Sequence, residues 1–176
     1  METKGNELRD PRAVKSLVVV FSCHHGNTEK IANAIANVLD APVKTPPQVS
    51  PEEIREYDLI GFGSGIYGAQ NHTSLIELAG RLPHAEGKKA FIFSTYGAPD
   101  ALFKGEMLRN FIHDNHSALR EKLQSRGYTI LDEFACAGLN TNSFLKFFGG
   151  LNKGRPGAED LRHAEEFAGN LKAAYR

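Results

Sequence analysis

The stretch SLVVVFSCHHGNTEKIANAIANVL, residues 16–39, decides the fold of this chain. Its first part, residues 16–21, is short, apolar at consecutive positions and rich in β-branched residues, as in a strand buried on both faces. From Thr28 onward the spacing changes, because apolar residues from Ile31 to Leu39 recur at helical intervals. The stretch therefore predicts a strand, a tight loop and a helix, and the buried strand indicates a parallel sheet.

The same alternation continues along the rest of the chain. Apolar runs predict further strands at residues 42–45, 58–62, 89–94 and 128–136. Helical spacing predicts a weak acidic helix at residues 51–54 and longer helices at residues 72–82, 104–125 and 159–175. Five strands alternating with helices indicate an α/β fold, a doubly wound five-stranded parallel sheet with helices on both faces. Because 176 residues is close to the usual size of one domain, we expect a flexible leader over residues 1–15 and a single domain over residues 16–176.

The charge balance and composition exclude several classes of protein. The chain has 21 basic and 21 acidic residues and no net charge, whereas a nucleic-acid binder shows a basic excess. Its longest strongly apolar run, residues 17–21, is far shorter than the roughly 20 residues of a membrane span. The charged first 15 residues hold no apolar segment of the kind found in secretion signals. With two cysteines, Cys23 and Cys136, and no disulfide framework, we expect a cytoplasmic protein that neither binds nucleic acid nor spans a membrane.

Three loops follow predicted strands at the carboxyl end, where open α/β sheets bind their ligands. The first, residues 22–28, joins a buried strand to a helix N-terminus, and its small residues leave backbone N–H groups facing outward. Such a loop suits a phosphate group, and it carries neither the P-loop ending nor the glycine pattern of dinucleotide-binding proteins. The alternative is an ordinary turn in which Thr28 caps the helix.

The second and third loops, residues 64–68 and 95–98, each combine glycine with tyrosine. Glycine lets the backbone approach a planar ring closely, and Tyr67 and Tyr96 are able to lie against an aromatic face. Together with the first loop, these residues predict a site for a planar ring that carries a phosphate. Each tyrosine taken alone is also consistent with a cap on the core.

Residues 21–35, FSCHHGNTEKIANAI, resemble the flavodoxin signature around the FMN phosphate. Cys23 and His25 depart from it, because flavodoxins usually carry hydroxyl residues at these positions, for which Ser22 and the imidazoles are able to substitute. Residues 62–67, 92–97 and 149–156 also resemble a flavodoxin-like family of microbial proteins. The resemblance implies the strand order 2-1-3-4-5 and an FMN bound noncovalently by all three loops. The implied FMN-binding residues are Ser22, His24, His25, Gly26, Asn27, Thr28, Ser64, Gly65, Ile66, Tyr67, Gly68, Thr95, Tyr96, Gly97 and Ala98.

The function implied is electron transfer through noncovalently bound FMN, with a redox partner protein or a small-molecule electron acceptor as the partner. Carrier flavodoxins tend to be strongly acidic, so the zero net charge leaves a second function open, an FMN-dependent NAD(P)H or quinone-type oxidoreductase. A third is a flavin-free binding module that uses the same cleft, since two phosphate-binding hydroxyls are replaced. The sequence leaves carrier and enzyme undecided, and it allows a homo-oligomer.

Other chemistry-bearing side chains have plainer interpretations. The adjacent His24 and His25 point apart and lack further ligands at metal-binding spacing, so we predict no metal site. His113 and His116 are predicted to form a solvated pair on a helix surface. Cys23 would lie beside a helix terminus that stabilises a thiolate, although a small buried thiol is the commoner case.

The long connection between residues 138 and 157 has no clear period and is expected to be functional or mobile. We expect Phe144, Phe147 and Phe148 to pack it against the body of the protein. The alternative is an exposed apolar patch for a partner, or a lid over the flavin.

Overall fold

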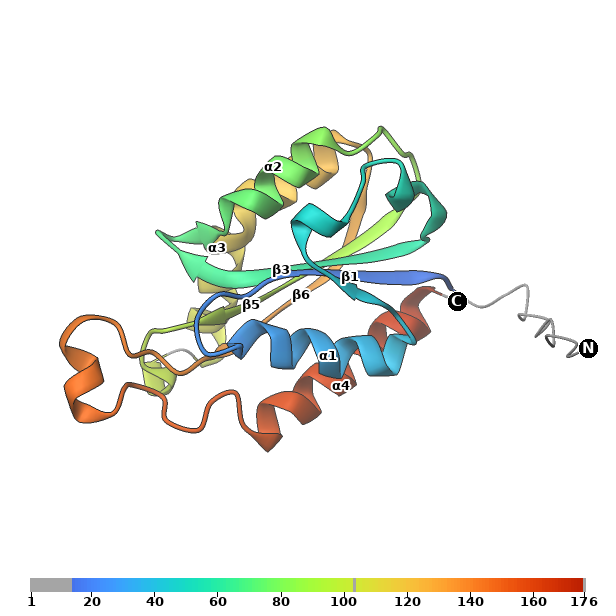
Figure 1. The fold of residues 1–176 in the computed structure, drawn as a ribbon. Coiled ribbons are helices and arrows are strands. Elements are labelled where there is room, and N and C mark those ends of the chain that lie inside the picture. Colours follow the sequence, from blue (N-terminus) through green and yellow to red (C-terminus); the bar gives the residue numbers. More distant parts are fainter. Residues whose placement is uncertain (1–13, 103, 176) are drawn as a thin grey trace, which may run out of the picture.

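The computed structural model describes residues 14–102 and 104–175, so most of the predicted leader lies outside the described residues. The parallel strands of its sheet are β1 Ser16–Phe21, β2 Val43–Lys44, β3 Leu59–Tyr67, β5 Lys89–Tyr96 and β6 Thr129–Ala137. Their order across the sheet is β2-β1-β3-β5-β6 (Figure 1). Counted along the chain, these parallel strands follow the expected order, so the prediction of a flavodoxin-like doubly wound sheet is confirmed.

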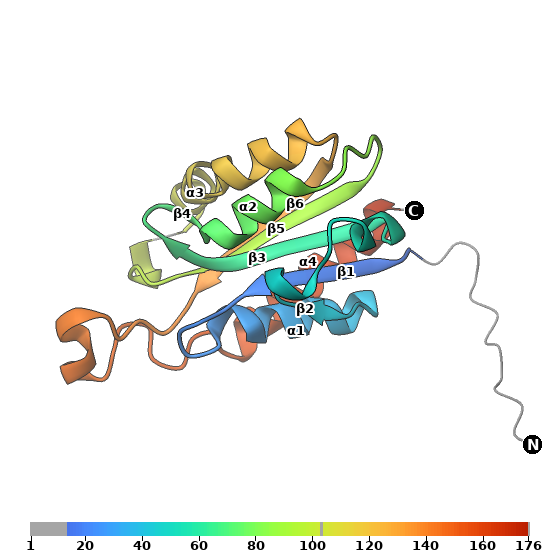
Figure 2. The same cartoon turned by 45° about the horizontal axis from the view of Figure 1, so that its top comes forward.

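Helices cover both faces of the sheet (Figures 1 and 2). One face carries α1 Asn27–Leu39 and α4 Ala158–Tyr175, and the other carries α2 Thr73–Arg81 and α3 Glu106–Ser125. Four short 3-10 helices lie in the described connections: η1 Pro46–Gln48, η2 Glu53–Glu56, η3 Asp100–Leu102 and η4 Ser143–Phe148. The weak helix predicted at residues 51–54 is instead η2. Within the described residues, no helix combines the length and the apolar character that crossing a membrane requires.

The packing of β1 explains its consecutive apolar residues. Leu17 and Val19 belong to the core between the sheet and the α2–α3 layer. Val18 and Val20 belong to the opposite core, which α1 and α4 cover. All four side chains are buried. Helices on both faces of the sheet therefore account for a strand without polar alternation.

Strand β3 extends to Tyr67, beyond its predicted end, because its glycines fit the neighbouring strand. Gly61 and Gly63 lie beside Phe91 and Phe93 of β5 in the parallel register. A Cβ on Gly61 would stand 2.2 Å from the ring of Phe91, and a Cβ on Gly63 would stand 2.1 Å from the ring of Phe93. The glycines thus make room for two buried phenylalanine rings and do not end the strand.

The predicted solvated pair on α3 is wrong for His116. Its side chain is fully buried, with Nε2 2.8 Å from Ser94 Oγ and Nδ1 2.9 Å from Glu133 Oε2, whereas His113 is exposed. Arg120 Nη2 donates to the same oxygen of Glu133 at 2.8 Å. Burial acts to raise the pKa of Glu133, but the hydrogen bonds and charges of His116 and Arg120 outweigh it and lower this pKa to about 2.

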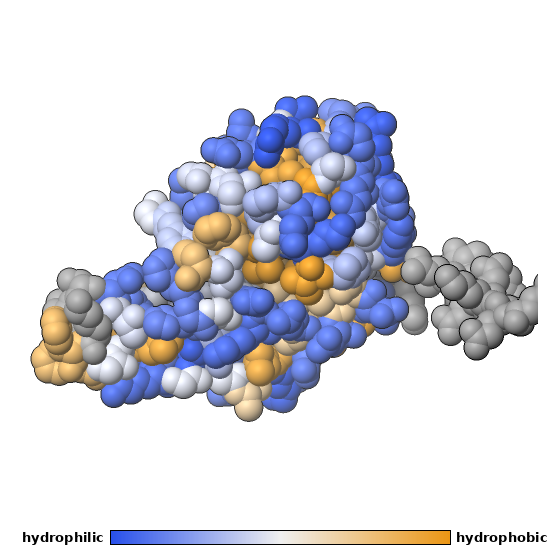
Figure 3. Space-filling view, viewed as in Figure 1, coloured by the Kyte–Doolittle hydropathy of each residue, from blue (hydrophilic) through white to orange (hydrophobic). Residues whose placement is uncertain are grey.

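The connection between residues 138 and 157 projects from the body beyond the carboxyl ends of the strands (Figures 1 and 2). Phe147 and Phe148 are 78% and 74% exposed on η4. Packing against the body is therefore wrong for these two residues, which are exposed, while a role in binding a partner or covering the flavin stays a prediction. The side chain of Phe144 lies outside the described part of the structure. Figure 3 shows apolar surface at the far end of the projection.

Candidate functional site

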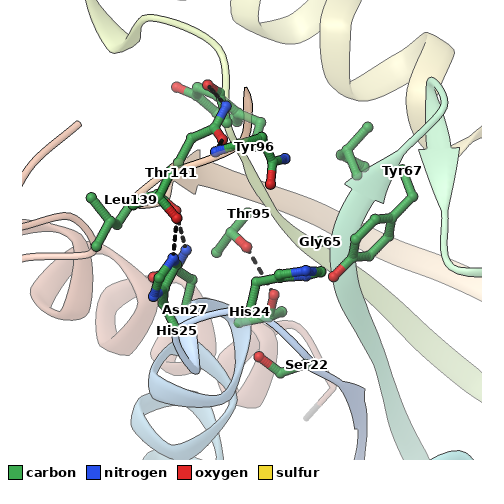
Figure 4. A pocket seen from close by; sticks show the side chains of 16 residues that line it. Ser22, His24, His25, Asn27, Gly65, Tyr67, Thr95, Tyr96, Leu139 and Thr141 are labelled. Carbon is green, nitrogen blue, oxygen red and sulfur yellow. Dashed lines mark hydrogen bonds between the residues drawn. The ribbon is translucent and has the colours of Figure 1, made fainter. Parts of the chain in front are cut away.

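The carboxyl ends of β1, β3, β5 and β6 meet at one edge of the sheet and surround a pocket of about 160 Å³ (Figure 4). Doubly wound sheets bind ligands at this edge, because neighbouring crossovers diverge there and leave a crevice. The pocket has four walls, one from the connection that follows each strand. It is lined by Ser22, His24, His25, Asn27, Thr28, Gly65, Ile66, Tyr67, Thr95, Tyr96, Gly97, Gly138, Leu139, Asn140, Thr141 and Asn142.

The connection from β1 to α1 forms the first wall. His25 and Gly26 both adopt left-handed backbone conformations, with φ of 58° and 63°, which turn the chain from the strand into the helix. α1 begins at Asn27 with Gly26 as its N-cap, so the alternative in which Thr28 caps the helix is wrong. The first N–H groups of a helix have no partner within it and carry the positive end of its dipole. This wall therefore favours an anionic group.

Two buried threonines join the first wall to the third. Thr28 Oγ1 and Thr95 Oγ1 lie 2.8 Å apart, and both residues line the pocket. A hydroxyl carries one hydrogen and accepts through its lone pairs, so the threonine that accepts in this pair keeps its own hydrogen for another acceptor. The pair thus offers the pocket one hydroxyl donor.

The end of β3 forms the second wall. There β3 pairs with the short antiparallel strand β4, Gln70–Asn71, across a turn that contains Gly68. A Cβ on Gly65 would stand 3.0 Å from Tyr67 Oη, so the tyrosine side chain lies close against the backbone of Gly65. Tyr67 Oη lies 3.1 Å from Cys23 Sγ. Burial, together with this thiol, raises the pKa of Tyr67, so its hydroxyl stays protonated at neutral pH.

The end of β5 forms the third wall, which is held by packing on its outer side. Tyr96 is buried; its Oη donates to Asp100 Oδ1 at 3.2 Å, and its ring meets that of Phe111 edge-on at 5.2 Å between centroids. Burial and the charge of Asp100 raise the pKa of Tyr96. A Cβ on Gly97 would stand 2.7 Å from Asn140 Nδ2, which donates to Gly97 O at 2.9 Å. These contacts therefore hold Tyr96 and Gly97 in place before any ligand binds.

The fourth wall, residues 138–142, holds none of the predicted FMN-binding residues, although the connection to which it belongs was expected to be functional or mobile. It is fastened to the first wall at two points: Asn27 Nδ2 donates to Leu139 O at 2.9 Å, and His25 Nε2 lies 2.8 Å from Thr141 Oγ1 (Figure 4). A signal for it was present, because the segment follows the fifth predicted strand at its carboxyl end and begins with a glycine. The rule that located the other walls also applies to this one.

Comparison with known proteins identifies the family to which this fold and pocket belong. The flavodoxin domain family matches residues 18–125, more than half of the chain. The chain belongs to the flavodoxin domain family. An uncharacterized protein of Methanocaldococcus jannaschii is 44% identical to it over 158 residues, which are 90% of this chain and 98% of that protein.

Solved structures share the fold of this flavodoxin domain. Oxidised Flavodoxin 2 from Bacillus cereus has a TM-score of 0.63 at 20% identity and covers 92% of this chain and 99% of its own. A flavodoxin from the domain Archaea has a TM-score of 0.59 at 18% identity, over 91% of this chain and 97% of its own. A WrbA-like flavodoxin from Agrobacterium tumefaciens reaches 0.58 at 14% identity, over 91% and 96%. At these identities the likeness shows the fold alone.

Most of the predicted site residues line the pocket of the flavodoxin domain, but Gly26, Ser64, Gly68 and Ala98 do not. Gly26 caps α1, and Gly68 lies in the turn between β3 and β4. Ser64 is fully buried, and its hydroxyl donates to a backbone carbonyl at 2.7 Å. The carbonyl of Ala98 accepts from Asn152 Nδ2 at 2.9 Å. These four residues shape the surrounding loops, while FMN binding by the others stays a prediction.

The residues of the pocket fit a ring that carries a phosphate. Among the described residues, Asn27 Oδ1 in the first wall is a buried acceptor with no hydrogen-bond partner, so it suits a hydroxyl or N–H of a ligand and not the phosphate itself. Ser22, His24 and the threonine pair add side-chain donors to the N–H groups of the first helical turn. At the other end, Gly65 and Gly97 line the pocket, with the side chains of Tyr67 and Asn140 lying where a Cβ would stand. An anion therefore fits one end of the pocket, and a flat aromatic group fits the other.

Proposed function

We propose that this protein binds FMN noncovalently in the pocket and transfers electrons through it. The observation that carries the proposal is one pocket that joins a helix N-terminus to two glycine–tyrosine loops. Membership of the flavodoxin domain family supports the same conclusion. The partner in this proposal is a redox protein or a small-molecule electron acceptor.

In this proposal the first wall holds the phosphate. Ser22, the ring of His24, the threonine pair and the first N–H groups of α1 would donate to it. The helix dipole contributes about 0.3–1 kcal/mol at an exposed site and up to about 2 kcal/mol in partly buried geometry. Each hydrogen bond to a charged group contributes about 1.5–3 kcal/mol more. His24 and the threonine pair would thus replace the hydroxyls that Cys23 and His25 do not supply.

The second and third walls would hold the ring. When bound, FMN supplies the capacity to take up and release electrons at its ring. The chain orients the ring with Tyr67, which is half-buried, and with Tyr96, which its partners fix. Because the pKa values of both tyrosines are raised, their hydroxyls stay neutral beside an electron-rich ring. Gly65 and Gly97 line the same part of the pocket, and their carbonyls accept hydrogen bonds from Ser64 Oγ and Asn140 Nδ2.

Titration with FMN tests the proposal directly. Adding micromolar protein to FMN should shift the visible absorption bands of the flavin and change its fluorescence, because the ring leaves water for a protein surface. No spectral change at micromolar protein would contradict the proposal.

Replacing one pocket threonine tests the location of the phosphate. Thr28→Ala should weaken FMN binding by about tenfold or more, because it removes a buried hydroxyl whose hydrogen bond to a charged group contributes about 1.5–3 kcal/mol. Thr45→Ala is the matched control, since Thr45 is exposed and its hydroxyl bonds locally to Gln48 Oε1 at 3.0 Å. Equal dissociation constants for the two variants would place the phosphate elsewhere.

A flavin-dependent oxidoreductase is a second candidate function, favoured by the balance of 21 basic and 21 acidic residues. Electron-carrier proteins use their net charge to attract partners of opposite charge, and this chain has a net charge of zero. Steady-state oxidation of NADH or NADPH with a quinone acceptor separates the two functions. Turnover favours the enzyme, and reduction only by a reductase protein favours the carrier.

A flavin-free binding module is a third candidate, favoured by Cys23 and His25 in place of hydroxyl residues. Such a protein would leave the FMN spectrum unchanged, and another phosphorylated ligand would raise its melting temperature.

A further inference from the structure

The tip of the connection between residues 138 and 157 exposes apolar side chains to solvent. It consists of η4 and the two glycines that follow, residues 143–150. Phe147 and Phe148 are 78% and 74% exposed there. Figures 1 and 3 show the tip standing clear of the body, with apolar surface at its far end. Two adjacent exposed rings at the end of a projection therefore point to contact with another surface.

The charge of this projection is one-sided. Residues 138–157 hold three basic residues and no acidic one, in a chain whose charges balance overall. One of the three, Arg155, belongs to the base of the connection, where its guanidinium pairs with Asp100 at 3.2 Å and with Asp160 at 2.8 Å. The other two are lysines, so the outer part of the projection is positively charged.

Lys153 brings that charge to the rings. It is exposed, and a Cβ on Gly149 would stand 2.6 Å from its Nζ. The ammonium therefore lies against the residue that follows Phe148. The tip is also closed on itself, because the N–H of Gly150 donates to Leu145 O at 2.8 Å. The rings and the cation are thus held together at one end of the projection.

We propose that this tip binds the surface of a membrane that contains anionic lipids. The rings would insert among the lipid headgroups and the upper acyl chains, while the ammonium of Lys153 stays at the level of the phosphates. Burial of apolar area and attraction to anionic lipids both contribute to binding of this kind. The chain would lie on the membrane without crossing it. The inference does not depend on FMN binding.

The size and shape of the tip favour a lipid surface over a protein. Because one aromatic side chain buries roughly 150–250 Å², two rings supply roughly 300–500 Å². Each partner in a standard protein–protein interface buries roughly 800 Å². A bilayer surrounds a protruding tip on every side, so it needs no matching flat surface on this chain.

Membrane binding would also orient the pocket. The connection that bears the tip forms the fourth wall of the pocket, and it projects beyond the carboxyl ends of the strands, where the pocket lies (Figures 1 and 2). A tip in the headgroup layer would therefore turn the carboxyl ends of the strands toward the membrane, and the amino ends away from it.

Sedimentation with lipid vesicles tests the proposal. The full chain, with and without FMN, is mixed with vesicles of phosphatidylcholine alone and with vesicles that also contain phosphatidylglycerol. It should bind the anionic vesicles at least about tenfold more tightly, and raising the salt concentration should weaken that binding. Equal binding to both kinds of vesicle would overturn the proposal. Binding to neither would also overturn it, and would leave an acidic protein as the partner of the tip.

Variants of the tip test whether it is the binding surface. Phe147→Ser combined with Phe148→Ser should weaken binding to anionic vesicles at least about tenfold, because the apolar area is lost. Met107→Ser, which alters a residue that is 56% exposed on α3, is the matched control and should leave binding unchanged. Lys153→Ala should weaken binding about fivefold. Lys122→Ala, which alters an exposed lysine near the end of α3, should not. Binding that survives the double replacement would overturn the proposal.

A fluorescent side chain reports insertion directly. The chain has no tryptophan, so Phe148→Trp places a single one at the tip and keeps its aromatic character. Its emission should shift to the blue with anionic vesicles, and lipids brominated on their acyl chains should quench it, because the ring leaves water for the bilayer. Met107→Trp should show neither change. Unshifted emission from Phe148→Trp protein that sediments with vesicles would show that another surface binds them, and would overturn the proposal.

Discussion

Two regions of the molecule reverse the usual placement of polar and apolar side chains. His116 is fully buried in the α3 layer, whereas Phe148 is 74% exposed at the tip of the connection between residues 138 and 157. The histidine is buried where Ser94 and Glu133 supply a hydrogen bond to each ring nitrogen. Burial of a polar group is thus set by the partners it finds, and not by its position in a helical pattern.

The exposed tip is possible because the base of the connection is held by other contacts. Asn140 and Leu151 exchange backbone hydrogen bonds of 3.0 and 2.8 Å. Asn152 Nδ2 donates to Ala98 O at 2.9 Å, and Asn152 Oδ1 accepts from the N–H of Asp100 at 3.2 Å. The connection therefore keeps its shape without burying Phe147 and Phe148. The buried cluster stabilises the fold, and the tip leaves apolar surface open to contact.

Between these two regions, the largest effect is expected from His116→Ala. The substitution leaves Glu133 with one partner fewer and Ser94 Oγ without its imidazole, so the free energy of unfolding should fall by about 3–4 kcal/mol. His113→Ala is the matched control, because His113 lies one turn earlier on the same helix and is exposed; it should change stability by less than about 0.5 kcal/mol. Urea unfolding followed by circular dichroism measures both. Similar losses would show that burial of His116 contributes nothing.

Acid should remove the contribution of Glu133. Its pKa is about 2 in the folded protein against an ordinary value of 4.5. Because the folded value is the lower one, the stabilisation is present above the ordinary value and is lost as the pH falls through the window between the two. The expected loss is roughly 3–4 kcal/mol, since the two pKa values differ by about 2.5 and a difference of one is worth about 1.4 kcal/mol. Urea unfolding at decreasing pH should show a smaller loss for Glu133→Gln than for the wild type, and equal losses would contradict the assignment.

The sheet could be predicted from the sequence because a strand buried on both faces has consecutive apolar residues. The apolar run of β1 and the helical spacing after Thr28 are both visible within a few residues. The burial of His116 leaves no such mark, since its partners lie 22 and 17 positions away along the chain. Spacing on a helix predicts which residues share a face, but the contacts of that face are long-range.

The pocket was predicted only in part for a related reason. Assigning whole loops to the site included Ser64, although successive residues of a strand point to opposite faces and this one points into the protein. The wall formed by residues 138–142 was missed because the strand-end rule was applied to three of the four connections that line the pocket. Its contacts with Asn27 and His25 depend on the folded chain. Strand ends locate the walls of the site from sequence, but the contacts that join those walls depend on tertiary structure.

Asn152→Gly tests whether the base of the connection holds it in place. Asn152 has φ of 56°, which glycine adopts without strain, so the substitution removes the side-chain hydrogen bonds alone. Stability should fall by about 1–2 kcal/mol, and amide hydrogen exchange should quicken across residues 138–157. Ala69→Gly is the control, because Ala69 also has a positive φ, of 63°, but no side-chain hydrogen bond. Unchanged exchange in Asn152→Gly would mean that other contacts hold the connection.

The smallest effect is expected at the tip itself. Phe148→Ser replaces a ring that is 74% exposed, so the free energy of unfolding should change by less than about 0.5 kcal/mol. Phe93→Ala is the contrasting variant, because that ring is fully buried against Gly63, and its loss should cost about 3–5 kcal/mol. A loss above about 1 kcal/mol for Phe148→Ser would show that the ring packs against the protein in solution. The tip would then belong to the fold, as His116 does, and its apolar surface would not be open to contact.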